Sequence, residues 1–259
     1  MRPLELLHAT CRKAVKPMVL LLAKTNITPN QITVLNFLFF IPLSVFFFSK
    51  GDYISSLIGL VLLCLYGFVD FIDGMLARLK SMSSRAGAWL DSTLDTITCS
   101  FVLISITIGL LNASERLSFF GIYNFGISDI AVVIVGILAF FAQLFCTLFM
   151  NGLENSVRLW SNAYKIEEVY RSQNSVPIHE RVLKSVLLPF SWSWLIFGYT
   201  VLIAIGVLLN LTFLTLVIVA ITHNIRVALL GYTSFRVNQG IDDPMIIRVA
   251  RSLLNQSKI

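Results

Sequence analysis

Long apolar segments dominate this 259-residue chain and limit what it can fold into. A helix needs about 20 mostly apolar residues to cross the hydrocarbon core of a bilayer. Six segments qualify: Ile32–Ser49, Tyr53–Arg78, Gly87–Leu111, Asp129–Met150, Val186–Leu208 and Leu211–Gly231. Charged residues make up 13% of the chain, about half of their share in soluble domains. The sequence therefore predicts an all-α integral membrane protein with six transmembrane helices and excludes a soluble globular domain.

The basic residues predict how this bundle sits in the membrane. Of the 20 Lys and Arg residues, 18 fall in the two termini and in the loops on the same side, and only Lys50 and Arg116 fall opposite. Short cytoplasmic loops retain Lys and Arg, whereas translocated loops avoid them. We therefore expect both termini in the cytoplasm. The net charge of +6 then reflects topology and attraction to anionic lipids, and no nucleic-acid partner is expected.

The regions outside the spans give the domain organisation. Residues 1–29 mix leucines and valines with basic residues, a pattern typical of an amphipathic helix lying in the membrane interface. We expect a six-helix catalytic domain over residues 30–236, which includes a cytoplasmic loop over 151–185. Residues 237–259 are expected to form a cytoplasmic tail.

Four aspartates lie at the facing ends of the second and third predicted spans: Asp70, Asp73, Asp91 and Asp95. Carboxylates are costly inside a membrane, so such a group indicates a functional site. Residues three or four apart share a helix face, and the short connection between the two spans brings both acidic faces together. Hard divalent cations balance clustered carboxylates. Four carboxylates can hold two metal ions, the arrangement that clamps a phosphoryl group.

Small residues accompany the aspartates on the same faces. Gly74, Ala77 and Gly87 remove side-chain bulk beside the carboxylates, which leaves room for a flat ligand next to the backbone. Small residues also serve simply as packing contacts between membrane helices. Arg78 can supply a fixed positive charge to a phosphate.

The pattern D-x2-D-G-x2-A-R-x8-G-x3-D-x3-D, which runs from Asp70 to Asp95, resembles the signature of the CDP-alcohol phosphotransferase (phosphatidyltransferase) family at all eight fixed positions. The predicted interfacial helix, the six spans and the Thr-Pro-Asn-x-x-Thr segment that begins at Thr28 are also similar to that family. The resemblance implies a homodimeric membrane enzyme of phospholipid biosynthesis, most typical of a prokaryotic cell membrane. Its cofactors would be Mg²⁺ or Mn²⁺, with two divalent ions expected.

The resemblance also implies roles for individual residues. Asp70, Asp73 and Asp91 would be metal ligands, and Asp95 would both bind metal and act as the catalytic base. Gly74, Ala77, Arg78, Gly87 and Thr33 would line the CDP site. Asp95 would take the proton of an acceptor hydroxyl, and the alkoxide would attack the β-phosphorus of the CDP-activated substrate to release CMP.

The substrates stay open at this point. The chain length favours a CDP-activated lipid donor, CDP-diacylglycerol or its archaeal ether analogue, and a polar alcohol acceptor. Transfer of a CDP-linked headgroup to a lipid alcohol is the alternative, and an ion-coupled transporter is a rival from another class. The segment from Gly87 to Asp95 resembles the inositol-phosphate branch of the family, but Thr96 stands where that branch often has arginine. Serine, glycerol phosphate, inositol phosphate and inositol are the candidate acceptors.

Overall fold

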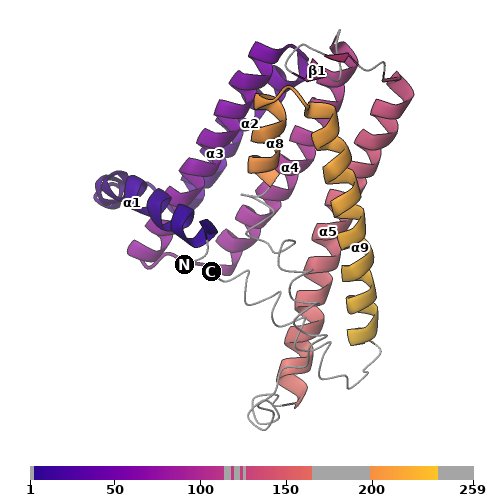
Figure 1. Cartoon of the computed structure of the whole chain (residues 1–259). Coiled ribbons are helices and arrows are strands. Elements are labelled where there is room, and N and C mark those ends of the chain that lie inside the picture. The colour runs from indigo at the N-terminus through magenta and orange to yellow at the C-terminus, as the bar shows by residue number, and fades with distance from the viewer. Residues whose placement is uncertain (1–2, 114–117, 120–122, 125–126, 165–198, 239–259) are drawn as a thin grey trace. The chain divides into compact units, whose positions relative to one another are not determined.

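A computed structural model describes residues 3–113, 118–119, 123–124, 127–164 and 199–238 (Figure 1). The described elements are nearly all helical. They are α1 (Pro3–Ala23), α2 (Pro29–Ser49), α3 (Tyr53–Leu79), α4 (Arg85–Asn112), β1 (Ser118–Phe119), β2 (Tyr123–Asn124), α5 (Asp129–Tyr164), α8 (Tyr199–Leu208) and α9 (Thr212–Asn238). The strands β1 and β2 form a short antiparallel pair, in which Ser118 faces Asn124. No pattern in the sequence predicted this pair.

Five of the described helices are long and apolar enough to cross a bilayer: α2, α3, α4, and the segments 129–149 of α5 and 212–232 of α9. This confirms the predicted all-α integral membrane fold. The ten residues of α8 cover the end of the predicted span 186–208, and residues 186–198 lie outside the described part of the chain. Helix α5 continues to Tyr164, so it includes the beginning of the segment 151–185. Residues 165–185 are not described.

Polar residues just before the first turns explain where α2 and α3 begin. Thr28 and Gln31 form a reciprocal capping box ahead of α2, and Pro29 occupies the first turn, where a missing N–H costs nothing. Asp52 accepts a hydrogen bond from the backbone N–H of Ser55 and caps α3. Hydrogen bonding to Ser55 also lowers the pKa of Asp52.

The helix α1 is anchored on α3 through a small apolar cluster. Val15 and Val19 of α1 are buried against Ile72 and Leu76 of α3. Figure 1 shows α1 crossing the end of α3 rather than running along it. Beyond the cluster, Lys80 at the end of α3 donates hydrogen bonds from Nζ to the carbonyl oxygens of Thr25 and Ile27, at 2.6 and 2.8 Å. These contacts fix the linker that leads into α2.

Polar contacts also connect α2 to its neighbours within the bundle. Ser44 Oγ donates to the carbonyl oxygen of Gly59 in α3 at 2.8 Å, and Asn112 Nδ2 at the end of α4 donates to the carbonyl oxygen of Ser49 at 2.8 Å. Near that end, Gly109 of α4 passes so close to the carbonyl of Phe48 that a Cβ at Gly109 would overlap it. Glycine at this position therefore permits the close approach of α2 and α4.

The chain divides into two compact units, residues Met1–Val133 with Ile203–Leu216 and residues Ile134–Leu202 with Val217–Ile259. The first unit contains α1 to α4. In the second unit, α5 and α9 are in contact, because Cys146 Sγ hydrogen-bonds the carbonyl oxygen of His223 at 3.5 Å and Gly231 lies beside the ring of Phe149. All of the residues predicted for the catalytic and CDP sites lie in the first unit.

Candidate metal and nucleotide site

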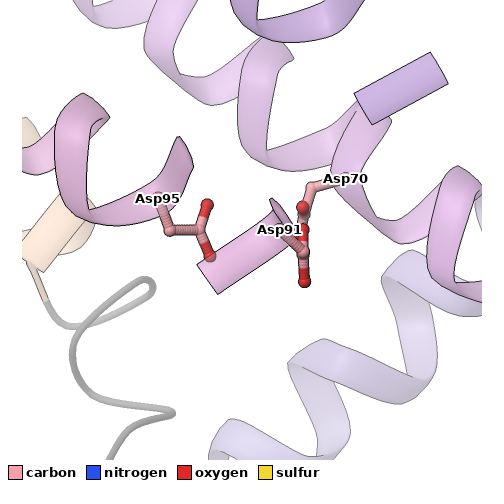
Figure 2. Close-up of side chains that lie close together, drawn as sticks. All are labelled: Asp70, Asp91 and Asp95. Atoms are coloured by element: carbon pink, nitrogen blue, oxygen red, sulfur yellow. The ribbon is translucent and has the colours of Figure 1, made fainter. Parts of the chain in front are cut away.

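Three of the four predicted metal ligands form one carboxylate cluster. Asp70 from α3 and Asp91 and Asp95 from α4 each place a carboxylate oxygen within 4.8 Å of the other two. Figure 2 shows the three carboxyl groups turned toward one another from the two helices. Asp91 and Asp95 share a face of α4 because they are four residues apart. Three clustered carboxylate oxygens are a donor set that suits a hard divalent cation.

Asp73 has a different environment from the other three aspartates. It lies almost one turn after Asp70 on α3, is 6% exposed, and accepts a hydrogen bond on Oδ2 from Thr33 Oγ1 of α2 at 2.5 Å. Thr33 Oγ1 also contacts the carbonyl oxygen of Pro29 at 3.2 Å. The structure therefore pairs two residues that the sequence analysis assigned to separate sites, with Asp73 predicted as a metal ligand and Thr33 as a CDP contact.

Asp95 is also held by a hydroxyl group. Tyr66 of α3 donates from Oη to Asp95 Oδ1 at 3.0 Å, and both side chains are buried. The sequence analysis did not single out Tyr66, because an aromatic residue within an apolar run is typical of a core position. Only the packing of α3 and α4 on α2 brings it to Asp95, which is 29 residues further along the chain.

A cavity of about 160 Å³ adjoins the acidic residues. It is lined by all five residues predicted for the CDP site, Thr33, Gly74, Ala77, Arg78 and Gly87, and by the aspartates Asp73 and Asp91. The remaining lining residues are Pro29, Asn30, Met82, Ser83, Ser84 and Ala88, which sequence reasoning did not assign. Asp73 and Asp91 therefore connect the cavity with the acidic residues, and Asp70 and Asp95 lie outside its lining.

Two helix N-termini and one arginine in the cavity wall favour a negatively charged ligand. The first turns of α2 and α4 both contribute to the wall, and helix N-termini favour negatively charged ligands. The Arg78 guanidinium lies beside Gly74, with Nη2 3.8 Å from the position that a Cβ would occupy there. A ligand with phosphate groups and a flat base fits this combination of fixed charge and missing side-chain bulk.

Adding a branched side chain at Gly87 tests the role of the cavity. A Cβ at Gly87 would lie 2.9 Å from Asn30 Oδ1 and 3.2 Å from Ser84 Oγ, and all three residues line the cavity. We expect Gly87→Val to raise the KM for the expected CDP-activated substrate about tenfold, equivalent to about 1.4 kcal/mol of lost binding. Gly67→Val is the matched control, because a Cβ at Gly67 meets no atom of the described residues within 4 Å. Equal KM values for the two variants would contradict a nucleotide site at this cavity.

The fold and the site together agree with the comparison to known families. Residues 26–166, more than half of the chain, match the family model of the CDP-alcohol phosphatidyltransferases. The chain belongs to the CDP-alcohol phosphatidyltransferase family. The matched region contains the whole motif from Asp70 to Asp95, so the resemblance inferred from the sequence is confirmed.

Individual relatives match shorter regions. The chain is 35% identical to an archaetidylinositol phosphate synthase of Pyrococcus horikoshii over 34% of this chain and 45% of that protein. It is 31% identical to a phosphatidylinositol phosphate synthase of Streptomyces avermitilis over 33% of this chain and 34% of that one. The matches thus span less than half the length of these relatives.

A solved structure shares the fold. It is a crystal structure of phosphatidylinositol phosphate synthase from Mycobacterium tuberculosis in complex with manganese and citrate. The two chains superpose with a TM-score of 0.51 at 16% identity, and the match covers 88% of this chain and 91% of that one.

Proposed function

We propose that this protein transfers a phosphatidyl-type group from a CDP-activated lipid to a polar alcohol and releases CMP. The observation that carries the proposal is the position of the cavity, whose wall includes Asp73 and Asp91 along with Arg78 and the small residues of the motif. A nucleotide bound there would place its phosphates beside carboxylates that can hold divalent cations. Membership of the family supports the same chemistry.

The donor atoms on α3 and α4 fit a divalent metal. Asp70, Asp91 and Asp95 would hold it through their clustered oxygens, and Asp73 would join them as a ligand of a second ion. Mg²⁺ or Mn²⁺ suits these oxygen donors, and either ion would neutralise the charge that develops on the phosphates during displacement. The solved relative that contains manganese agrees with this choice.

The protein's own groups supply the remaining chemistry. Asp95 accepts the proton of the acceptor hydroxyl as that oxygen bonds to the β-phosphorus of the CDP-lipid. The bond from the β-phosphorus to the bridging oxygen breaks, and CMP departs with that oxygen. Arg78 offsets negative charge on the phosphates, and Gly74, Ala77 and Gly87 leave space for the nucleotide. Thr33 acts through Asp73, whose carboxylate it holds.

The acceptor is best sought first among phosphorylated alcohols. The relatives named above are, by their names, synthases of archaetidylinositol phosphate and of phosphatidylinositol phosphate. Thr96, which stands where that branch often has arginine, uses its hydroxyl to bond the carbonyl oxygen of Ser92, so it brings no positive charge to the site.

A substrate panel tests the proposal. Purified protein with Mg²⁺ or Mn²⁺ is given CDP-diacylglycerol and, in separate reactions, serine, glycerol phosphate, inositol phosphate or inositol. We expect alcohol-dependent release of CMP with one acceptor preferred. A second arm supplies a CDP-linked headgroup with diacylglycerol, and activity only in that arm would assign the reverse arrangement. No CMP in either arm would contradict the proposal. Family membership favours both transferase alternatives over the ion-coupled transporter.

The arrangement in the cell is proposed on the same basis. We propose that the catalytic domain spans residues 30–236, that both termini face the cytoplasm and that the enzyme is a homodimer in a prokaryotic membrane. The distribution of Lys and Arg supports the orientation. Reporter fusions at residues 50 and 116 should then face the outside, and fusions at residue 80 the cytoplasm.

A further inference from the structure

We propose that Tyr66 is a positioning residue that fixes the orientation of the Asp95 carboxylate through its hydroxyl group. The inference rests on the proposed function, because Asp95 matters as a metal ligand and base. Tyr66 is 5% exposed and Asp95 is 7% exposed. The hydrogen bond from Tyr66 Oη to Asp95 Oδ1, 3.0 Å long, is therefore shielded from water.

The geometry shows what this hydrogen bond can control. The terminal torsion of an aspartate is broad, so an unrestrained carboxylate samples many orientations. Tyr66 engages Oδ1, while the carboxylate still supplies an oxygen to the cluster with Asp70 and Asp91. Tyr66 precedes Asp70 by one turn of α3, so one face of one helix carries both a cluster ligand and the group that orients Asp95.

Tyr66 is itself held from α2. Asn36 Nδ2 donates to the backbone carbonyl oxygen of Tyr66 at 3.0 Å, and Asn36 is buried. Thr33, three residues earlier on the same helix, donates directly to Asp73. One face of α2 therefore supports two of the motif aspartates, Asp73 by a direct contact and Asp95 through Tyr66. Groups that hydrogen-bond metal ligands in this way typically change metal affinity or activity 10–100-fold when they are removed.

The role requires the hydroxyl and not the aromatic ring, so Tyr66→Phe is the informative change. We expect the Kd for Mn²⁺ to rise about tenfold and kcat to fall about tenfold, the lower end of the range for such contacts. The KM for the CDP-lipid should stay unchanged, because Tyr66 does not line the nucleotide cavity. A purely structural role would lower thermal stability without this separation of kcat from KM.

Tyr53→Phe is the matched control. Tyr53 lies at the other end of α3, is 42% exposed, and donates from Oη to the carbonyl oxygen of Leu208 at 3.3 Å. The same atom is thus removed from the same helix, far along the chain from the aspartates. The Mn²⁺ affinity and the kcat of Tyr53→Phe should equal those of the unmodified protein.

The experiment titrates Mn²⁺ into purified protein by electron paramagnetic resonance and measures CMP release in parallel. If Tyr66 acts through Asp95, then Tyr66→Phe should weaken Mn²⁺ binding in the unmodified protein and add no effect in an Asp95→Ala background. An equal effect in both backgrounds would overturn the proposal, since general destabilisation persists when Asp95 is absent. Unchanged Mn²⁺ affinity in Tyr66→Phe would also overturn it. A wild type that binds Mn²⁺ but releases no CMP would instead refute the proposed function.

Discussion

Replacing Asp95 with asparagine should reduce the turnover of CMP release by about 10²–10⁴-fold, the contribution expected of a general base. Asparagine keeps the size of the side chain and can still accept the hydrogen bond from Tyr66. It cannot accept the proton of the acceptor hydroxyl, and it brings no negative charge to the cluster with Asp70 and Asp91. The measurement is steady-state release of CMP at saturating donor and acceptor.

Asp52→Asn is the control for this substitution. Asp52 lies just before the first residue of α3, at the opposite end of that helix from Asp70, and it caps the helix by accepting a hydrogen bond from the backbone N–H of Ser55. Asparagine caps a helix about as well as aspartate, so Asp52→Asn should leave both stability and turnover unchanged. Wild-type turnover in Asp95→Asn would remove Asp95 from the mechanism, and an equal loss in both variants would indicate a general effect on folding.

Removing divalent metal should abolish turnover, the second of the two large effects. Without cations, the carboxylates of Asp70, Asp91 and Asp95 repel one another within 4.8 Å, and the charge that develops on the phosphates loses its main stabilisation. We expect chelation with EDTA to reduce CMP release to background and added Mg²⁺ or Mn²⁺ to restore it. The measurement is a titration of each metal against the rate of CMP release.

Variants of the cluster provide the control for chelation. Asp70→Asn and Asp91→Asn should each raise the metal concentration needed for half-maximal rate, because each removes a charged ligand. Asp129→Asn, at the start of α5 and outside the cluster, should leave the metal requirement unchanged. Full activity after chelation would contradict a metal-dependent mechanism.

The membrane-spanning helices were predictable from the sequence because the thickness of the bilayer sets how many consecutive apolar residues a spanning helix needs. The predicted spans beginning at Tyr53 and Asp129 begin there in the structure, and the span predicted to end at Ser49 ends there. The extension of α5 to Tyr164 falls on less apolar residues, where hydropathy gives no boundary. The β1–β2 pair consists of two residues in each strand, too short for any periodicity to show.

The residues of the site were predictable only where they belong to a helical motif. Asp70, Asp91 and Asp95 follow from spacing on two connected helices, and the structure brings them together. The bond between Thr33 and Asp73 and the bond between Tyr66 and Asp95 depend on how α2, α3 and α4 pack, over separations of 40 and 29 residues. Sequence spacing carries no information about such contacts. Asn30 and Ser84 line the cavity, and their place there likewise depends on how the helices pack.

The most direct test of the central claim follows an oxygen atom through the reaction. Purified protein in lipid vesicles receives CDP-diacylglycerol, Mn²⁺ and the preferred acceptor labelled with ¹⁸O in its reacting hydroxyl, and mass spectrometry follows the products. We expect one CMP for each phospholipid formed, with the label retained in the new phosphodiester and absent from CMP. Label in CMP, or CMP released without phospholipid, would contradict attack of the acceptor oxygen on the β-phosphorus.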